Sequence, residues 1–178
     1  MKTGYSTIPH TQVPALLKGQ MIVLDLARLQ GQWGIVCSMP EIEFGDAVLL
    51  NQYLRAVQKR RAVLLGMLHL AHPPLDPHLP KAKALSMPLL ADPSGCLART
   101  LGLSGRSAPN RCQSFIFDQE GVIRYHLIHL FNWRGMSFLL ETLKHCQDLY
   151  PQPTRQSSAR LPHPLMLSGQ AYIPTPCL

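Results

Sequence analysis

The sequence predicts a single α/β domain over residues 1–150, with a central mixed β-sheet flanked by helices. Apolar runs of strand length alternate with helical patterns in the first half, and a helix, a hairpin and a last helix follow in the second. Two strands that are joined through a helix run parallel, whereas the strands of a hairpin are antiparallel. This order of elements therefore requires a mixed sheet with helices on both of its faces.

Two buried strands and one helix are expected in the first half. Residues 34–40 (GIVCSMP) form an apolar strand and its exit, and residues 62–67 (AVLLGM) form the next strand. Between them, residues 41–61 carry apolar side chains at helical spacing, namely Leu50, Tyr53, Leu54 and Val57. A further strand-like run, residues 22–24, precedes this unit.

A short helix is predicted after residue 92. Pro93 suits the first turn of a helix, because the N–H that proline lacks has no partner there, and Asp92 is expected as the N-cap. Apolar residues then share one face until Gly102 ends the helix. The preceding residues 69–80 hold four prolines and are expected to form a loop.

A β-hairpin and a last helix complete the domain. Residues 115–117 (FIF) and 122–125 (VIRY) are expected to pair, because Asp118 and Gly121 suit the first and fourth positions of a turn. Apolar residues at helical spacing then predict an amphipathic helix that ends near residue 150. Residues 151–178 contain six prolines and few charges, so we expect a Pro-rich C-terminal tail.

Composition excludes several functional classes. The net charge is +7, but the basic residues are scattered, so no nucleic-acid surface is expected. No apolar run approaches the roughly 18 residues that cross a bilayer, and no membrane contact is expected. The N-terminus lacks the apolar stretch of a secretory signal, which favours a cytoplasmic, reducing location. In such a compartment the five irregularly spaced cysteines are expected to be thiols.

Two longer motifs indicate a family. Residues 90–103 read Leu-Ala-Asp-Pro-x-Gly-x-x-Ala-x-x-x-Gly-Leu, and residues 115–123 read Phe-Ile-Phe-Asp-x-x-Gly-Val-Ile. Together they resemble the second half of the peroxiredoxins, thiol peroxidases built on a thioredoxin-like fold. The resemblance implies that a cysteine thiolate reduces hydrogen or alkyl peroxides and becomes a sulfenic acid, which a second thiol clears. The implied partners are a peroxide substrate, a thiol reductant and a second copy of the chain, and no cofactor is implied.

The peroxide-reactive position of the family falls on one of two residues. In one alignment it is Cys37, because Ser38 and Glu41 form the S-x-x-E pattern of a capping box and a helix would then direct its amides at the sulfur. In the other, Pro40 is the proline of the family motif and Ala47 stands in the cysteine position. The strand then runs through Cys37, which gains no helix amides, and burial should raise the pKa of its thiol.

These alignments correspond to two functions. The first is a peroxiredoxin-like thiol oxidoreductase with Cys37 as nucleophile, and the second is a non-catalytic redoxin-fold module that binds a partner or senses oxidation. For the enzyme, Arg111 is the candidate for the family arginine that polarises the peroxide and stabilises the thiolate. Cys177, near the end of the tail, resembles a resolving cysteine by position only.

The remaining cysteines and histidines carry weaker signals. Cys96, Cys112 and Cys146 are interpreted mainly as packing residues, with a redox role as the alternative for the first two. No Cys and His spacing matches a structural zinc site, so no metal is expected. His126 and His129 are three residues apart on a strand and should face opposite sides of the sheet.

Overall fold

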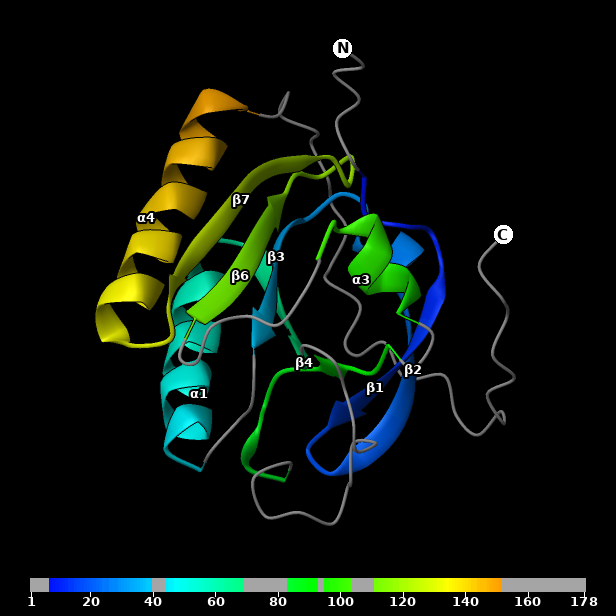
Figure 1. Cartoon of the computed structure of the whole chain (residues 1–178). Helices are drawn as coiled ribbons and strands as arrows, with labels where there is room; N and C mark the ends of the chain where they lie inside the picture. Colours follow the sequence, from blue (N-terminus) through cyan, green and yellow to red (C-terminus); the bar gives the residue numbers. More distant parts are fainter. Residues whose placement is uncertain (1–6, 40–43, 69–82, 93–94, 104–110, 152–178) are drawn as a thin grey trace.

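One mixed sheet of seven strands organises the chain (Figure 1). The computed structural model describes residues 7–39, 44–68, 83–92, 95–103 and 111–151. From one edge of the sheet to the other, the strands are β2 (Gln20–Asp25), β1 (Gln12–Leu17), β5 (Leu89–Leu90), β4 (Ala62–Leu68), β3 (Trp33–Met39), β6 (Arg111–Phe117) and β7 (Ile123–Leu130).

Helices cover both faces of this sheet. On one face, α1 (Phe44–Lys59) and α4 (Trp133–Leu149) pack on a core that includes side chains from β3 and β6. On the other face, the short helices η1 (Leu26–Leu29) and α3 (Cys96–Thr100) contribute to a second core. No helix in the described parts of the chain is long and apolar enough to span a membrane.

The two buried strands and the hairpin that the sequence predicts lie side by side in the structure. β3 pairs with β4 in parallel and with β6 in antiparallel orientation, and β6 pairs with β7 in antiparallel orientation. The parallel pair follows from the crossover through α1, and the antiparallel pair β6–β7 follows from the hairpin turn. The predicted α/β class with a central mixed sheet is therefore confirmed.

The register of β3, β6 and β7 places four polar or sulfur-bearing side chains on one face. Cys37 of β3 lies opposite Ser114 of β6, and Cys112 of β6 lies opposite His129 of β7. Side chains two residues apart on a strand share a face, so Cys112 and Ser114 point the same way. The four side chains thus lie under α1 and α4.

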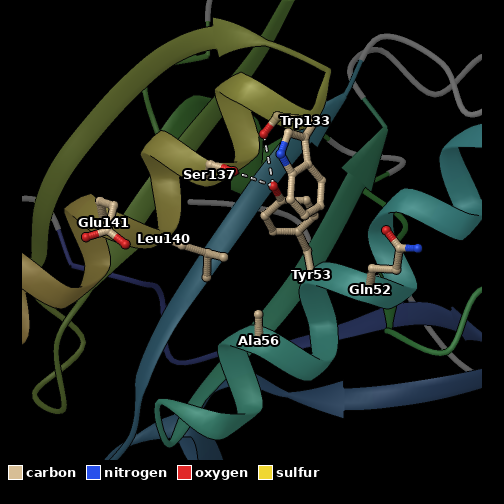
Figure 2. A pocket seen from close by; sticks show the side chains of 7 residues that line it. All are labelled: Gln52, Tyr53, Ala56, Trp133, Ser137, Leu140 and Glu141. Atoms are coloured by element: carbon tan, nitrogen blue, oxygen red, sulfur yellow. Dashed lines mark hydrogen bonds between the residues drawn. The ribbon is translucent and has the colours of Figure 1, made fainter.

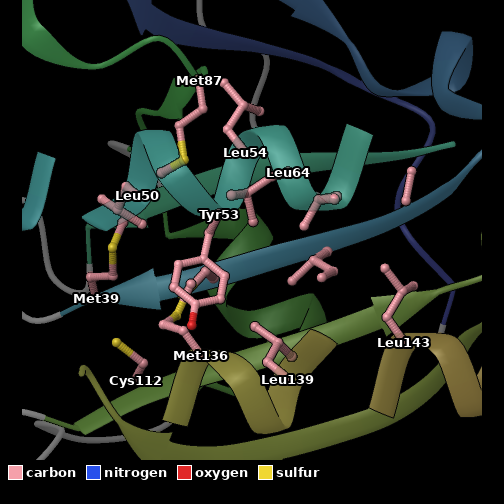
Figure 3. Close-up of a cluster of buried hydrophobic side chains, with 14 of the residues drawn as sticks. Met39, Leu50, Tyr53, Leu54, Leu64, Met87, Cys112, Met136, Leu139 and Leu143 are labelled. Carbon is pink, nitrogen blue, oxygen red and sulfur yellow. The ribbon is translucent and has the colours of Figure 1, made fainter. Parts of the chain in front are cut away.

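The two long helices are held to each other as well as to the sheet. The Tyr53 hydroxyl of α1 donates a hydrogen bond to the Trp133 carbonyl oxygen at 2.9 Å, and its oxygen lies 3.0 Å from Ser137 Oγ of α4. Figure 3 shows Tyr53 beside Met136 and Leu139 in the buried cluster that α1, α4 and the sheet share. Because the tyrosine is buried, its hydroxyl needs these partners.

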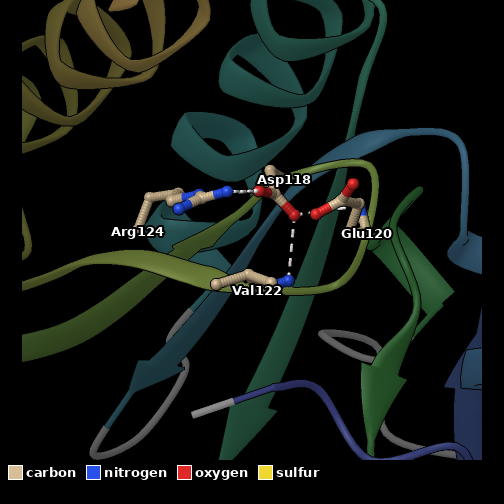
Figure 4. A network of polar contacts seen from close by, with 4 residues as sticks. All are labelled: Asp118, Glu120, Val122 and Arg124. Atoms are coloured by element: carbon tan, nitrogen blue, oxygen red, sulfur yellow. Dashed lines mark hydrogen bonds and ion pairs between the residues drawn. The ribbon is translucent and has the colours of Figure 1, made fainter. Parts of the chain in front are cut away.

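The hairpin turn depends on the buried Asp118. Its Oδ1 accepts hydrogen bonds from the backbone N–H groups of Glu120 and Val122, each at 2.9 Å, and its Oδ2 lies 2.6 Å from the Arg124 guanidinium (Figure 4). Gly121 has φ +78°, a conformation that glycine adopts without strain. This turn fixes the register of β7 against β6, and with it the position of His129.

Several local predictions are wrong. The sequence predicts neither β1, which contains Pro14, nor β5, which has only two residues. The helix after residue 92 begins at Cys96 with Gly95 as its N-cap, while the Asp92 carboxylate accepts a hydrogen bond from the Ala98 N–H. The predicted loop at 69–80 and the predicted tail at 151–178, apart from Pro151, lie outside the described residues.

Candidate functional site

Cys37 lies inside a strand and not at the start of a helix. It is the fifth residue of β3, it is fully buried, and Ser38 after it pairs with both Met67 and Gln113. The capping-box interpretation of Ser38 is therefore wrong, because a residue in a three-strand ladder cannot cap a helix. The strand continues to Met39 and α1 is described from Phe44 onward, as the second alignment predicts.

A chain of hydrogen bonds joins Cys37 to His129 across three strands. Ser114 Oγ donates to Cys37 Sγ at 3.3 Å and lies 2.8 Å from His129 Nε2. At the other side of the imidazole ring, Nδ1 lies 3.0 Å from the carbonyl oxygen of Leu130. Cys37 and Ser114 have no exposed surface, and His129 is 9% exposed.

The donors and acceptors in this chain accommodate a charged pair. A carbonyl oxygen only accepts, so His129 Nδ1 must carry a hydrogen to bond Leu130. The Ser114 hydroxyl uses its single hydrogen for Cys37, so its oxygen accepts a hydrogen from His129 Nε2. With the Ser114 hydrogen directed at Cys37, the contacts fit an imidazolium at His129, both of whose ring nitrogens donate, and a thiolate at Cys37 as the acceptor.

The electrostatics of the site agree with this assignment. The hydrogen-bond contact of the Cys112 side chain lowers the pKa of Cys37 well below its ordinary value and outweighs the opposing effect of burial, and the contacts with His129 and Ser114 lower it further. Burial opposes a charge on His129, but the interactions with Cys37 and the Leu130 carbonyl oxygen raise the pKa of the imidazole. The expectation that burial raises the pKa of Cys37 is wrong, because three side chains stabilise its thiolate.

Gly135 lets α4 approach this histidine closely. A Cβ atom at position 135 would lie 2.0 Å from the Leu130 carbonyl oxygen and 3.0 Å from His129 Nδ1. The helix N-cap, Asn132, accepts a hydrogen bond from the Gly135 N–H at 2.9 Å and fixes this first turn against the end of β7. Any larger residue at position 135 would have to displace the strand or the imidazole.

The structure does not bring Arg111 to Cys37. Arg111 is the first residue of β6 and is exposed, whereas its neighbour Cys112 is buried on the face of Cys37. Because adjacent strand residues face opposite sides, the guanidinium of Arg111 is directed away from the Cys37 sulfur. Ala47, the alternative position for the nucleophile, lies in the first turn of α1 with 1% of its surface exposed.

The other cysteines differ in chemical state. Cys37, Cys112 and Cys146 form no disulfide, and burial raises the pKa of Cys146 to about 11, which makes it unreactive at neutral pH. Cys96 is disulfide-bonded, so the expectation that all five cysteines are thiols is wrong. Cys177 lies outside the described residues.

A small pocket lies between the two long helices but does not reach the thiols. Its volume is about 170 Å³, and Figure 2 shows Tyr53 and Trp133 together at its side, with their ring centroids 5.5 Å apart. Its lining includes none of the side chains that contact Cys37. Within the described ranges, no group of three or more His, Cys, Asp or Glu side chains is arranged to hold a metal ion.

No protein-family model and no curated protein sequence matches the chain. Solved structures do match: Enterococcus faecalis AhpC has a TM-score of 0.63 and 21% identity over 84% of this chain and 95% of its own. The fold is that of the peroxiredoxins.

Two further peroxiredoxin-fold structures agree with this assignment. Mycobacterium tuberculosis AhpC matches with a TM-score of 0.63 and 18% identity, over 85% of this chain and 97% of its own. The 2-Cys peroxiredoxin of Plasmodium vivax in its reduced form matches with a TM-score of 0.63 and 17% identity, over 82% of this chain and 98% of its own.

Titration of the thiolate tests the site. We expect the wild-type protein to show thiolate ultraviolet absorbance at neutral pH that disappears only on acidification, because the pKa of Cys37 lies well below the value of about 8.5 for a free thiol. His129→Gln should move this transition to higher pH, because the imidazolium is lost while the sulfur stays buried.

Cys146→Ala is the matched control for this titration. It should keep the thiolate signal at neutral pH, because the raised pKa of Cys146 keeps that thiol protonated there. Cys37→Ala should lose the signal. An unchanged signal in Cys37→Ala would contradict the assignment of the thiolate.

Proposed function

We propose that this protein is a thiol-dependent peroxidase in which the Cys37 thiolate reduces hydrogen or alkyl peroxides. The observation that carries the proposal is the hydrogen-bond chain from Cys37 through Ser114 to His129, which holds a thiolate beside a proton donor. The thiolate is the nucleophilic form of cysteine, and a positioned imidazolium is an efficient general acid.

The proposed reaction balances within the site. The Cys37 sulfur attacks one peroxide oxygen, an S–O bond forms, and the O–O bond breaks. The leaving hydroxide or alkoxide takes a proton that His129 supplies through the Ser114 hydroxyl, so the products are a sulfenic acid and water or an alcohol. His129 is then neutral, and a thiol reductant restores Cys37.

Burial of Cys37 determines which peroxides react fastest. The sulfur has no exposed surface, so a substrate reaches it only when the structure opens locally. A small opening admits hydrogen peroxide more readily than a branched alkyl peroxide. We therefore infer that hydrogen peroxide is the better substrate.

The non-catalytic redoxin module is the second candidate. Two observations favour it: Ala47 occupies the position that the second alignment gives to the nucleophile, and Cys37 is fully buried. In that case the protein would keep the peroxiredoxin fold and would consume no peroxide.

Peroxide consumption separates these candidates. With purified protein, a dithiol reductant and hydrogen peroxide, we expect Cys37→Ala to lose all activity and His129→Gln to lose most of it, because a general acid typically contributes about 10²–10⁴-fold. Cys146→Ala should retain wild-type activity, since the Cys146 side chain lies in the apolar core that α1 and α4 share with the sheet. A wild-type protein with no turnover above the reductant alone would support the non-catalytic module.

A second copy of the chain is the partner that we propose for β7. This strand lies at the edge of the sheet, and its Ile128 and Leu130 are 61% and 52% exposed. Unpaired edges with apolar side chains are templates for pairing with another chain. Edge-to-edge pairing of two β7 strands would cover both residues.

Molar mass in solution tests this dimer. We expect a mass of twice the 19.9 kDa chain for the wild type and of one chain for Ile128→Lys, because a lysine on each β7 would place like charges across the interface. Val48→Lys, at a residue 53% exposed on α1, should leave the dimer intact. A wild-type monomer at high concentration would refute the dimer.

A further inference from the structure

Cys112 is the thiol in contact with Cys37, and the catalytic step above does not use it. The two side chains form a hydrogen-bond contact across β3 and β6, and neither cysteine has any exposed surface. Cys112 also lies directly opposite His129 in the ladder between β6 and β7. One imidazole therefore lies next to both thiols.

The backbone geometry keeps these sulfurs close but not bonded. Cys37 pairs with Ser114, so Cys112 is its diagonal neighbour on the same face. Diagonal residues on neighbouring strands have Cα atoms about 7–8 Å apart. A disulfide usually spans about 4.4–6.8 Å between Cα atoms, so bond formation requires the strands to approach locally.

The end of β6 is where such a movement is least hindered. The recorded ladder between β3 and β6 runs from the pair Gly34 and Phe117 to the pair Ser38 and Gln113. Cys112 lies one residue beyond its last pair, and its backbone is paired on the other side with β7. A shift at Cys112 toward β3 therefore breaks no pair of the β3–β6 ladder.

We propose that Cys112 is the resolving thiol of this protein and that it forms a reversible disulfide with Cys37 inside the sheet. Formation of this disulfide by peroxide rests on the proposed peroxidase function. It gives the sulfenic acid a partner that is already in place, two strand positions from Ser114, and it requires no contribution from the C-terminal tail.

The resolving step balances with the groups present. After peroxide reduction His129 is neutral, and it accepts the proton of the Cys112 thiol. The Cys112 sulfur attacks the Cys37 sulfur, an S–S bond forms, and the S–O bond of the sulfenic acid breaks. The departing hydroxide takes the proton back from His129 and leaves as water. An external dithiol then reduces the disulfide by thiol exchange.

The same geometry indicates that this disulfide is easily reduced. Closing a diagonal pair pulls two strands together, and a disulfide that departs from relaxed geometry is more readily reduced. Strained disulfides have more oxidising potentials and serve catalytic or regulatory roles, whereas relaxed ones are structural. Such a bond suits turnover by a dithiol reductant.

Mass spectrometry of the oxidised protein tests the proposal. We expect hydrogen peroxide to link the peptides that contain Cys37 and Cys112 with the loss of two hydrogen atoms. In Cys112→Ala the sulfenic acid on Cys37 should persist and react with dimedone, because its partner is gone. Cys146→Ala, the matched control, should form the same disulfide as the wild type.

A second arm separates this inference from the peroxidase proposal. The wild type is equilibrated with a buffer of reduced and oxidised glutathione, which forms a disulfide by thiol exchange without a sulfenic acid. If peroxide does not react but this buffer links the two cysteines, the peroxidase proposal fails and the dithiol pair stands. If Cys37 forms a sulfenic acid that persists equally in the wild type and in Cys112→Ala, or if neither oxidant links the pair, the inference is overturned.

Discussion

The hydrogen-bonded pair of Cys37 and His129 is the interaction on which the functional account depends. Burying an unpaired charge costs several kcal/mol, so neither a thiolate nor an imidazolium would persist alone in this core. Here each ion compensates the other, and Ser114 lies between them as donor to the sulfur and acceptor from the ring. Replacing such a pair with apolar residues often stabilises a protein, so its presence in the core is better explained by chemistry than by stability.

The charged pair of Cys37 and His129 exists only within a limited range of pH. The lowered pKa of Cys37 means that its stabilisation of the fold is present at high pH and is lost as the pH falls through the folded-state value. The raised pKa of His129 has the opposite effect. The stabilisation of the fold by the imidazolium is present at low pH and is lost as the pH rises through the folded-state pKa of His129. Thiolate and imidazolium therefore coexist only between these two values.

Most of the sheet can be predicted from the sequence, because its central strands have strong local signals. The apolar runs of β3 and β4 and the Asp118 turn each depend on residues close together in the chain. The start of α3 cannot be predicted in this way, because the Asp92 side chain bonds Ala98 and leaves the N-cap position to Gly95. β5 is stabilised by pairing with β1 and β4, which are distant in sequence.

Only part of the candidate site can be predicted from the sequence. Cys37 is a candidate from the capping-box pattern that follows it, although β3 continues through that pattern to Met39. Arg111 falls on the wrong side of β6 through a difference of one residue. No sequence motif marks Ser114 or His129 as functional. Only the register of β3, β6 and β7 brings these two side chains to the Cys37 sulfur. The prediction that His126 and His129 face opposite sides is confirmed, since His126 stacks on Phe115 of the other core while His129 contacts Ser114.

The protonation state of His129 tests the central claim most directly. Nitrogen NMR of the imidazole in the reduced protein at neutral pH distinguishes an imidazolium, with both nitrogens protonated, from a neutral ring. We expect an imidazolium in the wild type and a neutral ring in Cys37→Ala, because without the thiolate only the Leu130 carbonyl oxygen opposes the effect of burial on the pKa of His129. A neutral ring in the wild type at neutral pH would contradict it.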